Sequence, residues 1–385
     1  MKKKEKQYIS QLIEKYRGAG TAPPCPHFGQ CGGCLFQDMD YGDQLALKRE
    51  MVNDILQGIA AVDSVHPSDP YRYRSRMDMV TAFGRIGLRR RGSFRAVVDV
   101  TGCQIMREKT DNLYRKARPF LENIEGYDYL RHQGYLRYAV LREARYTGQV
   151  MLNFVVAEKE NRLSSVIDAV RDDVDSISII HHGGRADLSY GDIMETVKGG
   201  YIEESFEGVR YRITPNSFFQ SNAGIAVQMY RRIRDHARGR VLDLCAGVGS
   251  ISLFIAGAAE RVTGVELNPE AVEIAGANRE INGINNAEFV CADAAEFLGT
   301  GPGAYDTIVM DPPRTGMQRA VMERIDRMNA GTILYMSCNP KTFRDDVLML
   351  ENYRVESVEA FDMFPQTPHV ELFCVLRPRS GDVRF

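Results

Sequence analysis

One junction between an apolar segment and a glycine turn constrains the fold of this chain more than any other feature. Residues 240–244 run into the turn Cys245-Ala246-Gly247-Val248-Gly249-Ser250, and a second apolar stretch follows. Glycines let the backbone approach a ligand closely, and the start of a helix offers free N–H groups. Short apolar runs then alternate with helical stretches, which is typical of a parallel sheet with helices on both faces. The C-terminal half is therefore predicted to be a doubly wound α/β sheet that binds a nucleotide-like cofactor.

Polar residues at the ends of the predicted strands strengthen this interpretation, because a glycine turn alone is common at ordinary junctions. Glu266 ends the strand after the turn, where a doubly wound fold presents an acid to ribose hydroxyls, although a solvated strand-end acid is the plainer alternative. Asp293 follows the third strand and could accept a hydrogen bond from an adenine amino group. Asp311 and Cys338 follow the fourth and fifth strands. Ligands bind outside the carboxyl ends of such strands, so all four residues are expected on one rim.

The last predicted strand, 369–377, brings a carboxylate to the same rim if it inserts antiparallel, as an edge hairpin strand would. Glu371 would then lie near Cys338, so that a cysteine nucleophile and a carboxylate base face one pocket. The remaining C-terminal cysteines, Cys245, Cys291 and Cys374, are embedded in apolar strands, and we expect their thiols to be buried.

Five segments of the C-terminal half resemble the motifs of the RNA 5-methyluridine methyltransferase family. The segments are 215–222, 243–250, 311–314, 337–340 and 365–371. The resemblance implies a class I S-adenosylmethionine-dependent methyltransferase with a Rossmann-like seven-stranded sheet, which methylates C5 of uridine in RNA. It departs from many members at Ala246 and Ser250. By resemblance, the cofactor-binding residues are Gln220, Cys245, Gly247, Gly249, Ser250, Glu266, Asp293 and Asp311.

The chemistry of uracil agrees with these residues independently. C5 of uracil is a poor nucleophile until a thiolate adds at C6, after which C5 can attack a sulfonium methyl group and a base must remove the C5 proton. Cys338 is the predicted thiolate and Glu371 the predicted base. Three competing hypotheses are methylation of an amino group, methylation of cytosine C5, and an RNA-binding folding factor with incidental methylation. The first is disfavoured by Arg314 after Asp-Pro-Pro, and the second by the lack of a second cysteine there.

Four cysteines of the N-terminal half form a candidate metal site. Cys25, Cys31 and Cys34 lie within ten residues, and Cys103 follows later in the chain. An iron–sulfur cube accepts three local ligands and one remote ligand, whereas zinc often uses two Cys-x2-Cys pairs. The arrangement favours a [4Fe–4S] cluster over zinc or no metal, and the resemblance implies the same cluster. His27 is expected to be a loop residue, and the spacing does not indicate radical chemistry.

The segment 71–107 is strongly basic, with nine arginines and two acidic residues. On a strand its alternating arginines would share one face, which could neutralise phosphates while neighbouring tyrosines stack on bases. A solvated charged face is the plainer alternative, but the attached methyltransferase favours RNA binding. The candidate RNA-binding residues are Arg72, Arg74, Arg76, Arg89, Arg90 and Arg91.

Length and composition bound the organisation of the chain. Its 385 residues exceed one typical core, and 49 basic against 51 acidic residues neither favour nor exclude nucleic acid. We expect an N-terminal helix and cysteine segment at 1–66, a β-rich RNA-binding domain at 67–208, and the methyltransferase domain at 209–385. Residues 1–66 and 67–208 would together make an α+β region that carries the iron–sulfur cluster.

The expected location and partners follow from the same features. No apolar run reaches the length of a membrane span, so we expect a cytoplasmic monomer with no obligate protein partner. The family divides between the T-loop uridine of tRNA and uridines of 23S ribosomal RNA. Members with the cluster mostly act on 23S, and the chain has no room for the family's β-barrel domain before Cys25. We therefore expect a 23S rRNA substrate, with tRNA as the alternative.

Overall fold

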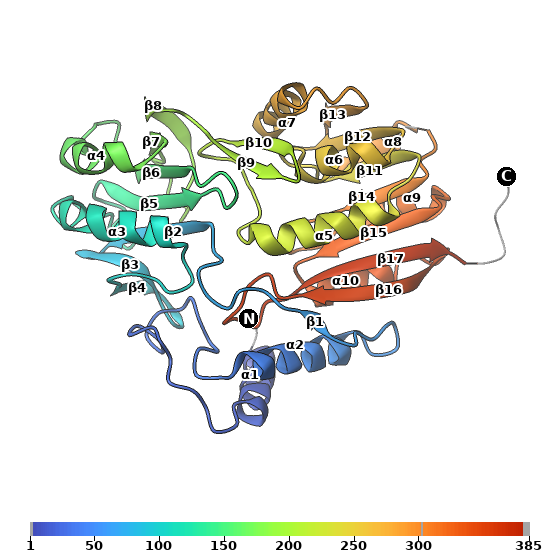
Figure 1. Ribbon diagram of the computed structural model, residues 1–385, viewed down its shortest axis with the longest axis horizontal. Coiled ribbons are helices and arrows are strands. Elements are labelled where there is room, and N and C mark those ends of the chain that lie inside the picture. The colour runs from blue at the N-terminus through green and yellow to red at the C-terminus, as the bar shows by residue number, and fades with distance from the viewer. Residues whose placement is uncertain (1–2, 302, 380–385) are drawn as a thin grey trace.

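Two large β-sheets lie side by side in the computed structural model, which describes residues 3–301 and 303–379 (Figure 1). The C-terminal sheet has the strand order β1-β16-β17-β15-β14-β11-β12-β13. Its strands are β1 (Val65–His66), β11 (Arg240–Leu244), β12 (Arg261–Glu266), β13 (Ala287–Cys291), β14 (Thr307–Met310), β15 (Thr332–Ser337), β16 (Tyr353–Phe361) and β17 (Glu371–Pro378). Strands β11 to β15 pair in parallel, whereas β17 runs antiparallel to both of its neighbours. The predicted doubly wound sheet is therefore present.

This sheet has one strand more than the seven that the resemblance implies. The additional strand, β1, comes from the N-terminal segment and pairs in parallel with β16. The helices of this half alternate with the strands and pack on the sheet through apolar residues. They are α5 (Ala223–His236), α6 (Ser250–Ile255), α7 (Pro269–Ile281), α8 (Ala294–Gly299), α9 (Arg319–Arg327) and α10 (Pro340–Val347), with a 3-10 turn η2 (Ala256–Ala258) after α6.

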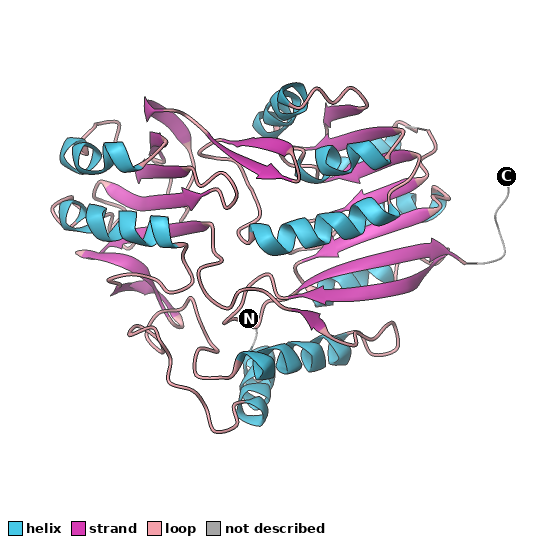
Figure 2. Cartoon of the chain, viewed as in Figure 1, coloured by secondary structure: helices cyan, strands magenta, loops and turns pink. Residues whose placement is uncertain are grey.

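The second sheet belongs to the middle of the chain and is mostly antiparallel, with the order β4-β3-β2-β5-β6-β7-β8. Its strands are β2 (Arg76–Ala82), β3 (Arg85–Arg90), β4 (Ser93–Asp99), β5 (Leu136–Glu143), β6 (Val150–Val156), β7 (Ser176–His181) and β8 (Asp192–Lys198). Two helices, α3 (Glu108–Leu121) and α4 (Ser164–Val170), lie on one face of it (Figure 2), and a 3-10 turn η1 (Arg171–Asp173) follows α4. No helix in 3–301 or 303–379 is long and apolar enough to cross a membrane.

The N-terminal helices pack on the C-terminal sheet and share its core. α1 (Lys3–Tyr16) and α2 (Tyr41–Ile55) contribute Ile9, Leu47 and Val52 to the apolar cluster that also contains Leu372 of β17. The expected boundary at 208/209 lies in the turn of the hairpin formed by β9 (Ile202–Phe206) and β10 (Val209–Ile213). The first 66 residues thus contact the expected methyltransferase domain directly, although they are far from it in sequence.

A buried ion pair joins α2 to the strap formed by residues 362–370, which connects β16 to β17. Lys48 Nζ lies 2.5 Å from Asp362 Oδ1, and neither side chain is exposed. The ammonium also donates to the carbonyl of Phe364, while the Tyr41 hydroxyl donates to Asp362 Oδ2 over 2.9 Å. Burial lowers the pKa of Lys48, and the carboxylate opposes that effect. The strap that precedes Glu371 is therefore fixed by residues more than 300 positions away.

Replacing Lys48 tests how much this pair stabilises the fold. Lys48→Met leaves the Asp362 carboxylate buried without its cation, which should lower the free energy of unfolding by about 3–5 kcal/mol. Lys15→Met is the matched control, because Lys15 pairs with Glu50 at the same 2.5 Å but its side chain is 58% exposed. Denaturant unfolding should show little change for this control. Equal effects of the two substitutions would contradict the importance of the buried pair.

Candidate active site

A cavity of about 900 Å³ lies at the carboxyl ends of the parallel strands in the C-terminal sheet. Its lining includes residues that follow β11, β12, β14 and β15, as expected for an open α/β sheet. Gly249 and Asp293 are sequence candidates that do not line it. The candidates that it does bring together are Gln220, Cys245, Gly247, Ser250, Glu266, Asp311, Cys338 and Glu371.

The turn after β11 has a backbone that requires glycine. Gly247 and Gly249 have φ angles of 54° and 78°, in the left-handed region. A Cβ at position 249 would lie 2.7 Å from Cζ of Phe289, so a larger residue would collide with that ring. Next to it, the Ser250 carbonyl accepts from the Tyr211 hydroxyl at 3.0 Å. Gly249 therefore shapes the turn without reaching the cavity, while Gly247 and Ser250 line it.

Glu266 is held in place by the backbone around it. Its Oε2 accepts from the N–H of Gly247 and its Oε1 from the N–H of Asn268, both over 2.9 Å. Each oxygen retains a second lone pair toward the cavity, so the carboxylate can still accept from hydroxyl groups of a ligand. The strand-end position predicted for Glu266 is thus connected directly to the glycine turn.

Asp293 follows β13, as the sequence analysis expected, and it also begins a helix. Its Oδ1 accepts from the N–H groups of Ala295 and Glu296 at the start of α8, and Gln318 donates to its Oδ2. An N-cap aspartate is a common structural role. The structure therefore places Asp293 at the beginning of α8, outside the set of residues that line the cavity.

Two aspartates near the end of β11 and β14 are strongly desolvated. Burial, together with repulsion from Asp311, raises the pKa of Asp243 to about 7. Ser252 Oγ donates to Asp243 over 2.5 Å, and this hydrogen bond limits the rise in pKa. Burial also raises the pKa of Asp311 to about 7, while a hydrogen bond from Gln220 opposes it. Gln220 Nε2 is 3.5 Å from Asp311 Oδ2. Burial thus favours the protonated form of both carboxyls, and Asp311 lines the cavity.

Cys338 and Glu371 meet because β17 inserts antiparallel beside β15, as the sequence analysis expected. Ser337 is opposite Leu372 in the register, so Cys338 and Glu371 follow at the same end of the two strands, and both line the cavity. Burial and the Glu371 charge raise the pKa of Cys338 to about 11. Burial and Asp311 raise the pKa of Glu371 well above its usual value. Arg314, which also lines the cavity, lowers both pKa values.

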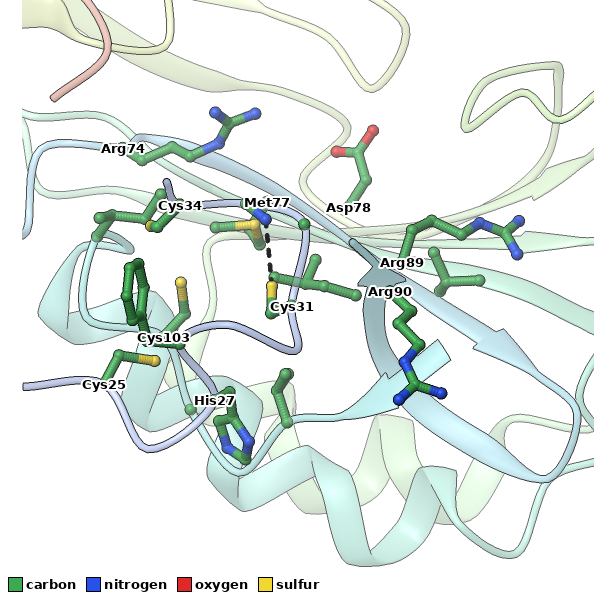
Figure 3. A pocket seen from close by; sticks show the side chains of 18 of the residues that line it. Cys25, His27, Cys31, Cys34, Arg74, Met77, Asp78, Arg89, Arg90 and Cys103 are labelled. Carbon is green, nitrogen blue, oxygen red and sulfur yellow. Dashed lines mark hydrogen bonds between the residues drawn. The ribbon is translucent and has the colours of Figure 1, made fainter. Parts of the chain in front are cut away.

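A second cavity, of about 680 Å³, lies between the N-terminal segment and the middle sheet. Cys25, Cys31, Cys34 and Cys103 all line it, and Figure 3 shows their thiols gathered around one space. The cysteine segment is tied to β3, because Cys31 forms a bridge with Arg90 and Gly32 N–H donates to the Arg89 carbonyl. Cys103 is therefore brought to the same cavity as the three cysteines of the N-terminal segment.

The chemical state of these thiols bears on metal binding. All four are free, and burial raises the pKa of Cys34 to about 12 and that of Cys103 to about 11. Nε2 of His27 accepts from the N–H of Thr101 over 3.0 Å, which agrees with its expected role as a loop residue. Within the part of the chain that the structure describes, no group of three or more His, Cys, Asp or Glu side chains is arranged to hold a metal ion.

The structure corrects the expected arginine face. Arg72 has a φ of 56° and precedes β2, so Arg72, Arg74 and Arg76 do not lie together on one strand. Acidic partners are present as well, because ion pairs join Arg72 to Asp111, Arg76 to Asp78 and Arg89 to Asp187 at 2.8–3.0 Å. Asp111 and Asp187 come from segments that fold back onto the basic region, whereas Asp78 lies two residues from Arg76 on β2 itself. Arg90 and Arg91 are exposed residues, and the Arg91 guanidinium also donates to the Cys34 carbonyl and lies over the Phe28 ring.

The burial expected for the isolated cysteines holds only in part. Cys374 is fully buried, as predicted, and Cys245 is half-buried at the cavity. Cys291 is exposed, because it ends β13, the edge strand of the sheet. An edge strand has a neighbour on one side only, so its last residue need not be covered even when the strand is apolar.

Several residues of the cavity were not identified from the sequence. Asn216 and Phe218 belong to the segment 215–222, so that motif contained a signal for them. Phe364 lies in the strap before β17, and the motif around residue 365 pointed near it. Tyr190 comes from the loop between β7 and β8, where nothing in the sequence marks a functional residue.

Comparisons with known proteins show the family of the chain. The tRNA (uracil-5-)-methyltransferase family matches residues 302–379, and the methyltransferase small domain family matches residues 221–334. The chain is 35% identical over 383 residues to a tRNA (uracil(54)-C(5))-methyltransferase of Pyrococcus furiosus, covering 97% of this chain and 91% of that protein. The chain belongs to the RNA uracil-5-methyltransferase family. It is an RNA (uracil-C5)-methyltransferase with the class I methyltransferase fold.

Two further relatives extend the similarity in this family. The tRNA (uracil(54)-C(5))-methyltransferase of Pyrococcus abyssi is 37% identical over 359 residues, which is 92% of this chain and 86% of that protein. A crystal structure of the Pyrococcus abyssi tRNA (uracil-54, C5)-methyltransferase in complex with S-adenosyl-L-homocysteine matches with a TM-score of 0.78 and 35% identity. That match covers 89% of this chain and 85% of that one.

The buried aspartates predict a specific pH dependence of stability. Their pKa rises on folding from 3.8 to about 7, so the folded state binds more protons and stability is lost as pH rises through this range. Asp243→Asn stays neutral at every pH, so its free energy of unfolding should fall less than that of the wild type between pH 4 and about 8.

Denaturant titrations across this pH range check the prediction. Asp63→Asn, at an exposed position, is the matched control and should follow the wild type. An Asp243→Asn variant with the same pH dependence as wild type would contradict the desolvation argument.

Proposed function

We propose that this chain methylates C5 of a uridine in tRNA, at the position that its relatives' names give as uracil 54. The Pyrococcus furiosus and Pyrococcus abyssi relatives described above are named for this nucleotide. Their names favour the tRNA alternative over the expected 23S rRNA. The observation that carries the reaction is the meeting of Cys338 and Glu371 in one cavity.

S-adenosylmethionine supplies the methyl group when it is bound. Support for this donor comes from the match to a structure that holds S-adenosyl-L-homocysteine. In our proposal Glu266 accepts from ribose hydroxyls, since its oxygens are fixed by the turn and keep free lone pairs. Gln220, Asp311 and the turn residues Cys245, Gly247 and Ser250 line the same cavity. Gly249 contributes by shaping the turn, and Asp293 by beginning α8.

Cys338 and Glu371 divide the chemistry of the uracil ring. The Cys338 thiolate adds to C6, and the electron pair moves through C5 toward the C4 carbonyl as an enolate. C5 would then form its bond to the methyl group as the bond between that group and the sulfonium sulfur breaks, which leaves S-adenosyl-L-homocysteine. The Glu371 carboxylate takes the C5 proton, and the C6–S bond breaks to return the thiolate. A raised carboxyl pKa makes the Glu371 anion a stronger base, and Arg314 favours the charged forms of both groups.

The N-terminal and middle regions present the RNA in this proposal. Residues 1–66 and 67–208 bind the RNA and residues 209–385 transfer the methyl group. Arg90 and Arg91 are exposed and suited to contact phosphates. Arg72, Arg76 and Arg89 hold the loops of this surface through their ion pairs. Arg74 also shapes it, because its Nε donates to the Arg76 carbonyl.

We also propose that Cys25, Cys31, Cys34 and Cys103 hold a [4Fe–4S] cluster. Four free thiols line one cavity, which agrees with the three local ligands and one remote ligand that a cube accepts. Each ligand loses its proton on binding, which offsets the raised thiol pKa.

Trapping the covalent intermediate tests the reaction and the substrate together. With a T-arm RNA hairpin and radiolabelled cofactor, Glu371→Gln should transfer one methyl group and then remain bonded to the RNA, because the C5 proton has no acceptor. Cys338→Ala should form neither a covalent band nor product, although it still binds RNA. Denaturing gels distinguish the two variants.

An RNA in which cytidine replaces the target uridine is the control for the substrate. It should give no band with Glu371→Gln, and a 23S-derived fragment that traps better than the T-arm would overturn the tRNA assignment. A covalent band with Cys338→Ala would transfer the nucleophile to another residue.

Iron analysis tests the cysteine site separately. Protein purified without oxygen should be brown and contain about four irons per chain. Cys31→Ser should lose most of the colour, whereas Cys291→Ser, at an exposed cysteine outside the cavity, should keep it. Stoichiometric zinc without visible absorbance would refute the cluster.

A further inference from the structure

The loop between β7 and β8, residues 182–191, forms the wall between the two cavities. Asp187 and Ser189 line the cavity that contains the four cysteines, here called the cysteine cavity. Tyr190 and Gly191 line the cavity that contains Cys338 and Glu371, here called the reaction cavity. In the proposed function the target base enters the reaction cavity, while the RNA backbone follows the basic rim of the cysteine cavity. The RNA must therefore pass this wall. The proposed function uses this loop only through the pair of Arg89 with Asp187 and assigns no role to Tyr190.

A buried arginine shapes the first half of the loop. Arg137 is fully buried, and its guanidinium donates to the carbonyls of His182, Gly184 and Ala186 over 2.7–3.2 Å. It also stacks 4.0 Å from the ring centroid of Tyr127. Burial of a guanidinium is costly unless its N–H groups are bonded, and Nε of Arg137 has no partner among the described residues. The Arg137 guanidinium is therefore a desolvated charge whose hydrogen bonds hold this loop in one conformation.

Side chains from the sheet fix the second half of the loop. Arg89 donates to Asp187 over 2.8 Å, and the Tyr138 hydroxyl bonds the same carboxylate. Ser189 Oγ donates to Asp78 over 2.5 Å. Figure 3 shows Arg89 and Asp78 near the cysteine cavity. The loop is thus bonded on the side that faces the middle sheet.

Tyr190 is an exposed aromatic residue within this clamped segment. Its neighbour Ser189 is bonded to Asp78, and its other neighbour, Gly191, is bonded through both backbone groups to the side chain of Asn216. The Tyr190 side chain nevertheless remains 52% exposed at the mouth of the reaction cavity. A rigid backbone that presents one exposed ring loses little entropy when the ring is covered by a partner.

We propose that Tyr190 stacks on a base of the RNA next to the target uridine. The inference rests on the proposed RNA substrate. A uridine that reaches Cys338 must leave its stack, so a neighbouring base loses one stacking face. Aromatic side chains replace such contacts in single-stranded RNA recognition, and tyrosine does so for any base. Tyr190 lies where the strand enters the cavity.

Steady-state kinetics with the T-arm hairpin test the proposal. Tyr190→Ala should raise KM for the RNA about tenfold, as expected for the loss of one stacked base, with kcat at saturating RNA unchanged. Tyr190→Phe and Tyr190→Trp should retain the wild-type KM, because they keep an aromatic face. Tyr146→Ala is the matched control, since Tyr146 is also 52% exposed but lines neither cavity.

A spectroscopic measurement separates this proposal from the proposed function. With 2-aminopurine beside the target uridine, wild type should quench the fluorescence, whereas Tyr190→Ala should not. Wild-type quenching without methylation would refute the function but keep the stacking. Methylation with unchanged quenching in Tyr190→Ala would refute the stacking. Weaker S-adenosylhomocysteine binding by Tyr190→Ala, or a Tyr146→Ala effect of the same size, would also overturn it.

Discussion

The antiparallel insertion of β17 between β15 and β16 is the constraint on which the active site depends. In a fully parallel sheet the first residue of β17 would lie at the opposite edge from the cavity. Reversal of the strand puts Glu371 beside Cys338, at the end of β15. The strap before β17 must then cross the rim, and the Lys48–Asp362 pair and the hydrogen bonds between Gln44 and Gln366 hold it there.

Desolvation gives this arrangement its chemical character. Asp243, Asp311, Cys338 and Glu371 are all shifted toward their protonated forms, mainly by burial. Protonation of these groups avoids placing several negative charges together in the site. Arg314 is the nearby cation that offsets this effect for Cys338 and Glu371, so charge can form when a substrate excludes water and supplies its own polar groups.

The N-terminal segment connects the two cavities to one framework. Cys34 is followed by Leu35 and Phe36, whose N–H groups both donate to the carbonyl of Gln366 in the strap. The cysteine cavity and the carboxylate of the reaction cavity are consequently joined through a few hydrogen bonds. Such coupling explains why residues 1–66 pack with the C-terminal sheet, even though the middle sheet intervenes in sequence.

The sequence by itself determined the doubly wound sheet, the strand-end position of Glu266 and Asp311, and the pairing of Cys338 with Glu371, because strand periodicity and chain direction fix which end of a strand a residue occupies. Only the tertiary structure decided the partners of Arg72 and Arg89, the exposure of Cys291, and the position of Tyr190. Each depends on contacts between segments distant in sequence, and local patterns carry no information about which distant carboxylate, strand edge or loop will lie beside a given residue.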